Sequence, residues 1–145
     1  MRVKIVLMAT LLLAFSTLPG CDSLGENPGL KFLADYQKNT DGTITFTLTL
    51  RNEGSRSLEL VSTTSQIYDL EIYREPGVLV WNWAHDLSFA TVITTVTLQP
   101  GEQKTYQVTW NIRSNQGDPV PPGTYGARAR LVTDPSASYK FEIKI

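Results

Sequence analysis

Two residues of this chain stand alone in their chemistry: Cys21 is its only cysteine and His85 its only histidine. A Ser–His–Asp hydrolase would need His85 as the base, with Asp69 or Asp86 orienting the ring. The sequence has no Gly-x-Ser-x-Gly turn to expose a nucleophilic serine. Side chains that follow one another on a strand point to opposite faces, so His85 and Asp86 make a poor pair. We therefore expect no enzyme activity and no catalytic residue.

Metal binding has equally little support in the sequence. One histidine and one cysteine cannot supply the usual zinc ligand sets. The carboxylates are scattered and lack the spacing of a calcium loop. We expect neither a metal site nor a cofactor.

Cys21 lies at the end of an export signal. Arg2 and Lys4 form a basic start, residues 5–18 are mostly apolar, and Pro19-Gly20 stands before the cysteine. These are the parts of a secretory signal, and the apolar run is shorter than the roughly 20 residues of a membrane-spanning helix.

The ending Leu18-Pro19-Gly20-Cys21 resembles the bacterial lipobox. The resemblance implies that residues 1–20 are removed and that the sulfur of Cys21 takes a diacylglyceryl group. An ordinary secretory signal with a chance cysteine is the alternative. With two or more acyl chains attached, the protein would stay on a lipid bilayer. We expect it on the exported side of the cell membrane or the outer membrane.

The rest of the chain is predicted to form a tether and one domain. Residues 21–29 carry the lipidated cysteine and a polar segment with Gly and Pro, and the eight residues 22–29 span at most about 28 Å. Residues 30–145 are enough for one hydrophobic core. Without Arg2 and Lys4, 11 basic residues face 14 acidic ones, for a net charge of −3. No basic cluster suits nucleic acid, so we exclude it as a partner.

Alternation of apolar and polar residues dominates the domain, as in strands with one face in a core. The alternating segments are 30–36, 43–50, 68–72, 106–112, 125–131 and 139–145. Three more segments are rich in β-branched and aromatic residues, namely 58–61, 78–83 and 90–98. Turn signals separate them, with hairpins expected at 39–42 and 52–55 and a tight turn at 99–102. The pattern predicts an all-β, antiparallel β-sandwich of about 7–9 strands, with a possible tyrosine corner at Tyr125.

An ordered set of short motifs runs through residues 30–132. In chain order they are Arg51-Asn52, Ser65-Gln66-Ile67-Tyr68-Asp69-Leu70, Gly77-Val78-Leu79-Val80-Trp81-Asn82-Trp83, Phe89, Leu98-Gln99-Pro100-Gly101-Glu102, Trp110 and Val120-Pro121-Pro122-Gly123-Thr124-Tyr125. Together they resemble the BsuPI-type intracellular proteinase inhibitor family. The resemblance implies an immunoglobulin-like sandwich and inhibition of a serine-type proteinase. It supplies no reactive-site motif, and the expected export contrasts with the intracellular name.

Candidate partner-binding residues lie in and after the segment 78–83. Trp81 and Trp83 share one face of the expected strand, where they form either an aromatic anchor or part of the core. His85 lies in the loop 82–88. Asn115 and Asp118 lie in the polar loop 113–120. Loops on a rigid scaffold often carry binding residues, although both segments could be plain connectors.

Arg128 and Arg130 share an exposed face of the expected strand 125–131. They could bind an acidic partner or lipid headgroups, but we interpret them as a solvated strand surface that discourages edge pairing.

Two functions of different kinds remain open from the sequence. The first is a membrane-anchored module that inhibits or modulates a protease by non-covalent loop binding. The second is a structural or assembly lipoprotein of the cell envelope, which would hold a non-protease partner by an exposed strand edge or aromatic patch.

Overall fold

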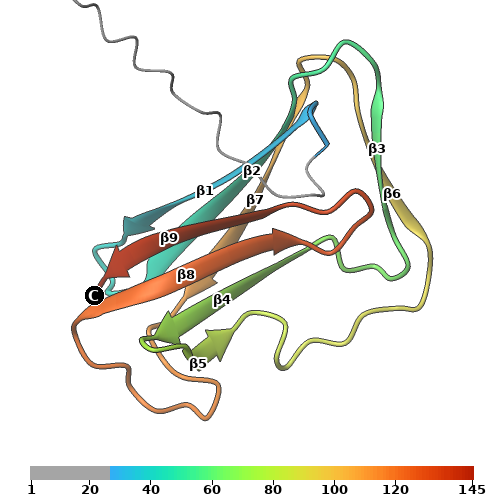
Figure 1. The fold of residues 1–145 in the computed structure, drawn as a ribbon. Coiled ribbons are helices and arrows are strands. Elements are labelled where there is room, and N and C mark those ends of the chain that lie inside the picture. Colours follow the sequence, from blue (N-terminus) through green and yellow to red (C-terminus); the bar gives the residue numbers. More distant parts are fainter. Residues whose placement is uncertain (1–26) are drawn as a thin grey trace, which may run out of the picture.

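The computed structural model describes residues 27–145 (Figure 1). This part of the chain contains nine strands and no helix long and apolar enough to cross a membrane. The strands are β1 (Leu30–Lys38), β2 (Ile44–Asn52), β3 (Leu58–Ser62), β4 (Tyr68–Arg74), β5 (Val78–Asn82), β6 (Thr94–Leu98), β7 (Gln103–Trp110), β8 (Thr124–Leu131) and β9 (Ser138–Lys144). Cys21, the signal 1–20 and most of the tether lie outside the described residues.

The strands form two layers and a small ribbon. One layer has the order β1-β2-β7, the other has the order β5-β4-β8-β9, and β3 pairs with β6 alone. All pairings are antiparallel. Figure 1 shows the two layers stacked, with the β3–β6 ribbon at one rim. The fold is an all-β, immunoglobulin-like antiparallel β-sandwich, which confirms the predicted fold class.

Period-two alternation explains the core between the layers. On β2, Ile44, Phe46, Leu48 and Leu50 have no exposed surface, while the threonines between them lie on the other face. Trp110 on β7 is also buried, and its indole N–H donates to the carbonyl of Arg113 at 2.8 Å. The sandwich interior thus comes from residues that the alternation assigns to one face.

Two predicted turns have the expected geometry. The Asn39 N–H donates to the Thr43 carbonyl, and Gly42 has a φ of 82° in this hairpin between β1 and β2. The Tyr125 hydroxyl donates to the Pro121 carbonyl at 2.7 Å, which confirms the tyrosine corner.

The predicted hairpin at 52–55 is wrong, because β2 and β3 belong to different sheets. Asn52 holds this crossover together and is almost fully buried. Its amide nitrogen donates to the carbonyls of Arg56 and Leu98, and its Oδ1 accepts from the Gly54 N–H. Residues such as Asn, Gly and Ser are common both in hairpins and in connections between sheets. The local sequence therefore does not tell which of the two connections forms.

Two predicted strands are shorter than expected. β7 ends at Trp110 because Ile112 has a φ of 58°, which no strand residue adopts. β6 begins only at Thr94, opposite Ser62 at the end of β3, so residues 90–93 have no neighbouring strand. In the first place the alternation, and in the second the run of β-branched residues, continues in the sequence while the pairing stops.

Candidate functional site

Asn115 fastens the loop 112–120 to the edge of β5. Its Oδ1 accepts from the Asn82 N–H at 2.8 Å, and its Nδ2 donates to the Asn82 carbonyl at 3.1 Å. Its own N–H donates to the Val80 carbonyl at 3.2 Å. One residue therefore takes the place of a neighbouring strand along this edge. Asn115 was predicted as a partner-binding residue, and the structure places it in contact with the domain's own backbone.

The loop 112–120 is also fastened within itself. The Val120 N–H donates to the Ile112 carbonyl, and the Ser114 N–H donates to the Asp118 carbonyl at 2.8 Å. The Arg113 guanidinium donates to the Gly117 carbonyl at 2.8 Å. These bonds leave the tip at 116–119, which includes the candidate Asp118, exposed to solvent.

Ile112 turns the chain into this loop at the cost of backbone strain. It is β-branched, and its φ of 58° lies in the left-handed region. Such a conformation costs on the order of 1–3 kcal/mol and persists where surrounding contacts hold it. Ile112 packs against the core, and the next carbonyl, that of Arg113, accepts from Trp110. The loop is thus held in a conformation that the chain alone would disfavour.

Trp81 and Trp83 are half-buried and pack against the core. Trp81 lies beside Trp110, with ring centroids 5.6 Å apart. Trp83 stacks on Tyr68 at 4.5 Å and lies 5.8 Å from Phe89. Such pairs stabilise packing beyond their buried area, so both tryptophans contribute to the scaffold beneath the candidate loops.

His85 lies at the surface, in the loop after β5. Its Nε2 is 3.7 Å from the Asp86 carboxylate, and the two side chains are 49% and 85% exposed. Asp69, the other residue considered as its partner, bonds instead to the Arg130 guanidinium, the Asn82 side chain and the Leu70 N–H. The structure therefore does not assemble the Ser–His–Asp geometry weighed from the sequence.

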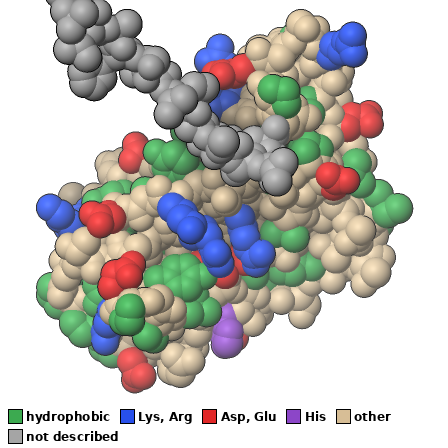
Figure 2. Space-filling model, viewed as in Figure 1, with side chains coloured by type: hydrophobic (Ala, Val, Ile, Leu, Met, Phe, Trp, Pro, Cys, Tyr) green, Lys and Arg blue, Asp and Glu red, His purple; other side chains and the backbone are tan. Residues whose placement is uncertain are grey.

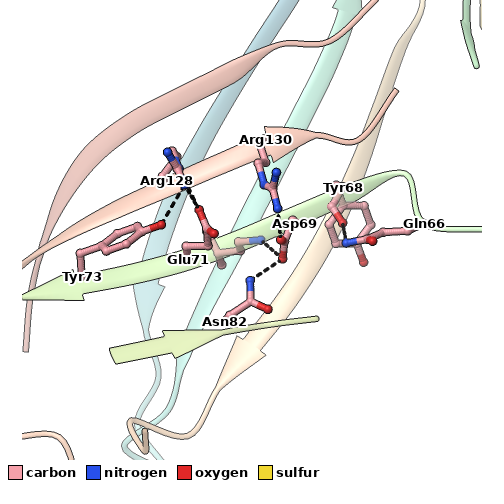
Figure 3. Close-up of polar contacts among 9 residues, drawn as sticks. Gln66, Tyr68, Asp69, Glu71, Tyr73, Asn82, Arg128 and Arg130 are labelled. Atoms are coloured by element: carbon pink, nitrogen blue, oxygen red, sulfur yellow. Dashed lines mark hydrogen bonds and ion pairs between the residues drawn. The ribbon is translucent and has the colours of Figure 1, made fainter. Parts of the chain in front are cut away.

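Two ion pairs cross the outer face of β4 and β8 (Figure 3). Arg128 pairs with Glu71, and its Nε donates to the Glu71 carboxylate at 2.7 Å. Arg130 pairs with Asp69 at 2.9 Å. The carboxylate side chains are only 12% and 3% exposed, although they lie on an outer face. In the space-filling view, basic side chains lie across the middle of this face, close to acidic ones (Figure 2).

The Arg128 and Arg130 side chains are 38% and 45% exposed, in line with the expected solvated surface. The sequence analysis missed that each arginine also covers a buried carboxylate on the neighbouring strand. The physical reason is pairing: β4 and β8 lie side by side, with Glu71 opposite Arg128 and Asp69 opposite Arg130. Opposite charges in such cross-strand positions attract each other. In the sequence, the signal for these ion pairs is that Asp69 and Glu71 lie two residues apart, as Arg128 and Arg130 do.

Tyr73 extends this row of charges. The Arg128 guanidinium donates to the Tyr73 hydroxyl at 2.8 Å and lies 5.5 Å from the centre of its ring. Burial raises the pKa of Tyr73 above its usual value, and the hydrogen bond to Glu71 raises the pKa of Arg128. Both shifts favour the protonated forms of these groups, in which the contacts are made.

Asp69 links this outer face to the candidate loop. It accepts from the Asn82 Nδ2 at 2.8 Å, while the Asn82 backbone is bonded to the Asn115 side chain. A continuous path of polar contacts thus runs from Arg130 through Asp69 and Asn82 to Asn115. Sequence reasoning missed Asp69 and Asn82 as supports of the loop, because their partners are 33 to 61 residues away in the chain.

A hollow of about 430 Å³ lies beside the ion pairs, over Gly126 on β8. Its lining includes Arg128 and Lys140 as well as Glu75 and Glu142. Tyr73, Ala127 and Phe141 contribute apolar surface to the same lining, so the hollow is an open depression of mixed polarity.

Comparison with known proteins places this domain in a family. The family model described as BsuPI, intracellular proteinase inhibitor, matches residues 30–136. No curated protein matches the chain. A CARDB domain from Pyrococcus furiosus shows 16% identity and a TM-score of 0.43, over 79% of this chain and 90% of that one.

This chain also resembles parts of two larger proteins of known structure. The sporulation control protein Spo0M from Bacillus subtilis shows 14% identity and a TM-score of 0.45, over 81% of this chain and 48% of that one. A β-glucosidase from Thermotoga neapolitana shows 17% identity and a TM-score of 0.37, over 80% of this chain and 17% of that one. The family match covers most of the described domain, and the chain belongs to the BsuPI family of intracellular proteinase inhibitors.

Proposed function

We propose that this domain binds a protease and inhibits or modulates it without chemistry of its own, through the loop 112–120. The observation that carries the proposal is a loop with an exposed tip that hydrogen bonds fasten both within itself and to β5. Family membership supports the kind of partner.

The advantage of such a loop is entropic. A flexible loop loses conformational freedom on binding, and this loss subtracts from affinity. Asn115 and Ile112 hold the loop 112–120 before any partner arrives. The side chains at the tip, including Asp118, can then contact a protease cleft with little ordering.

The proposal includes attachment to a membrane. Lipid on Cys21 and a tether of residues 22–29 would keep the domain close to the bilayer on the exported side. The target would then be a protease of the same compartment.

A second candidate function is that of an envelope protein that holds a non-protease partner. The observation that favours it is the exposed apolar surface of the β5–β6 connection, where Leu87 is 46% exposed and Val92 is 52% exposed. A partner that covers these side chains would gain hydrophobic stabilisation.

The test of inhibition is a titration of the mature protein against a panel of serine proteases. We expect reversible, stoichiometric inhibition of at least one of them at micromolar concentration. Gln116→Ala combined with Asp118→Ala should weaken it at least tenfold and leave the unfolding midpoint unchanged. Thr105→Ala, at an exposed position of β7, is the matched control and should inhibit like the parent. Absence of both inhibition and binding across the panel would overturn the proposal.

The test of attachment is mass spectrometry of the protein isolated from bacterial membranes. We expect a chain that begins at Cys21 and carries the added mass of the lipid, and we expect Cys21→Ser to lose that mass. A mature chain with a free thiol in the soluble fraction would contradict the anchoring and leave the inhibition test unaffected.

A further inference from the structure

The outer edge of β6 offers unpaired backbone groups. In its sheet, β6 has β3 as its only neighbour within the described residues. The Val61 N–H and carbonyl both bond to Asp134, on the far side of β3. Val61 lies opposite Thr95, so this pair exchanges no hydrogen bonds and the Thr95 N–H and carbonyl point away from β3. Thr97, two residues further on, points the same way.

Within residues 27–145, this edge lacks the usual protection against pairing. Exposed edges normally carry a charge, a proline or a covering loop. Asn115 covers β5 and Asp134 covers part of β3. The segment 91–98 contains only Thr, Val, Ile and Leu, with five residues of it in the strand. Nearly all of these are β-branched residues of high strand propensity.

Apolar side chains extend the edge beyond the end of β3. Ile93, directly before β6, is 75% exposed, and the period of two assigns it to the row of Thr95 and Thr97. On the neighbouring strand, Val61 belongs to the same face and is 37% exposed. Pairing of a further strand along β6 would cover Ile93 as well as satisfy the backbone groups.

We propose that the β6 edge pairs antiparallel with the β6 edge of a second copy of this chain. A two-fold axis at Thr95 places Thr95 opposite Thr95 of the second copy and Ile93 opposite Thr97 of the second copy. Because both strands are uncharged, the pairing brings no like charges together. Thr97 separates Glu59 from the second copy's strand, so the acidic residues of the two ribbons stay apart.

The contact is small, so the dimer is weak. Stable interfaces bury about 1,200 Å² or more, whereas this one joins two five-residue strands and their flanks. We expect dissociation on the order of 100 μM, in the range of transient complexes. The pairing does not depend on protease binding, because loop 112–120 lies on a different edge.

Sedimentation equilibrium of the mature chain from 10 μM to 1 mM tests the pairing. Cys21→Ser in every sample excludes a disulfide dimer. We expect a monomer–dimer equilibrium that Ile93→Lys abolishes. Thr95→Pro should abolish it too, and because its N–H is outside the β3–β6 ladder, the fold should survive. Thr105→Lys, on the edge of the other sheet, is the matched control and should dimerise normally.

Amide hydrogen exchange gives an independent readout. In the parent, exchange at Thr95 and Thr97 should slow as concentration rises, while exchange at Thr94 and Val96 stays constant. A protein that is monomeric at 1 mM, or a dimer that survives both Ile93→Lys and Thr95→Pro, would overturn the proposal. Protease inhibition by Ile93→Lys should equal that of the parent, which separates this test from the proposed function.

Discussion

The loop 112–120, which follows β7, and the β5–β6 connection, residues 83–93, differ in how they are held. In the loop 112–120, backbone and side-chain bonds close a small hairpin, and Asn115 ties it to β5. The β5–β6 connection is anchored near its two ends, where the Trp83 N–H donates to the Leu70 carbonyl and Ala90 exchanges two hydrogen bonds with Ser65. Between these anchors it has only local turns, such as the bond from the Leu87 N–H to the Ala84 carbonyl. It exposes apolar side chains instead, with Ile93 at 75%.

Two loops that look equally promising as binding segments in the sequence are therefore suited to different kinds of contact. A fastened polar loop loses less freedom on binding, which suits the proposed contact with a protease. A looser segment with exposed apolar side chains gains from being covered. The first suits a defined target, and the second suits self-association or a broader partner surface.

The largest expected effect comes from removing the support shared by both loops. Asp69→Ala deletes the acceptor for Arg130, for the Asn82 side chain and for the Leu70 N–H. We expect a loss of about 2–4 kcal/mol in the free energy of unfolding, measured by urea titration, because the Asn82 side chain and the Leu70 N–H lose their acceptor and a charge-assisted bond from Arg130 is removed. Asp118→Ala, an acid at an exposed tip, should change it by less than about 0.5 kcal/mol.

Repair of the same pair sharpens this prediction. Asp69→Leu with Arg130→Met should recover part of the lost stability, since apolar residues often replace a buried pair well. Equal stability of Asp69→Ala and Asp118→Ala would show that the outer-face ion pair does not support the loops.

The next effect separates the two loops. Asn115→Ala removes two side-chain hydrogen bonds to the β5 backbone, and we expect a loss of about 1–3 kcal/mol. Amide exchange should accelerate at 113–119 and at Asn82, and remain unchanged at 87–93. The control is Gln116→Ala at the exposed tip, which should leave exchange as in the parent. Uniform acceleration over both loops would show that they are not independent.

Alkaline pH should lower the free energy of unfolding of the domain, through two tyrosines that lie near Trp83. Burial raises the pKa of Tyr68, which stacks on Trp83, and of Tyr106 beside it. Above pH 10 the unfolded chain releases protons that the folded chain still holds, so stability falls as pH rises toward the folded pKa values. Urea midpoints should be level from pH 8 to 9 and lower at pH 11. Tyr68→Phe should reduce this fall in the urea midpoint. If the fall were unchanged in that variant, its cause would be a group other than Tyr68.

The smallest effect is expected in the looser loop. Leu87→Ser changes a side chain that is 46% exposed. The free energy of unfolding should therefore differ from that of the parent by less than about 0.5 kcal/mol. Thermal melting monitored by circular dichroism would reveal a larger loss. Such a loss would mean that the segment 83–93 packs as firmly as 112–120.

Local patterns predict much of this fold. Alternation along residues 44–50 identifies a strand and its buried face, and Gly42 and Gly101 mark turns where positive φ is observed. The Tyr125 hydroxyl donates to the carbonyl of Pro121, four residues earlier, as the predicted tyrosine corner requires. In each case the cause lies within a few residues, where sequence reasoning is strongest.

Features that depend on distant partners could not be predicted in the same way. Asn52 looks like a hairpin residue and in fact binds Leu98, 46 residues away. Asp69 and Glu71 look solvated because their arginines belong to a strand about 60 residues later. The polar loop around Asn115 predicts a binding residue from local composition alone. The bonds of Asn115 to Asn82 depend on how the sheets assemble.

The most direct test of the account is amide hydrogen exchange of the domain alone and in complex with a protease that it inhibits. We predict protection on binding at residues 113–119, together with slow exchange at Asn82 in both states and no change at 87–93. Protection confined to 87–93, with the loop 112–120 exchanging freely in the complex, would contradict the central claim that the fastened loop makes the contact.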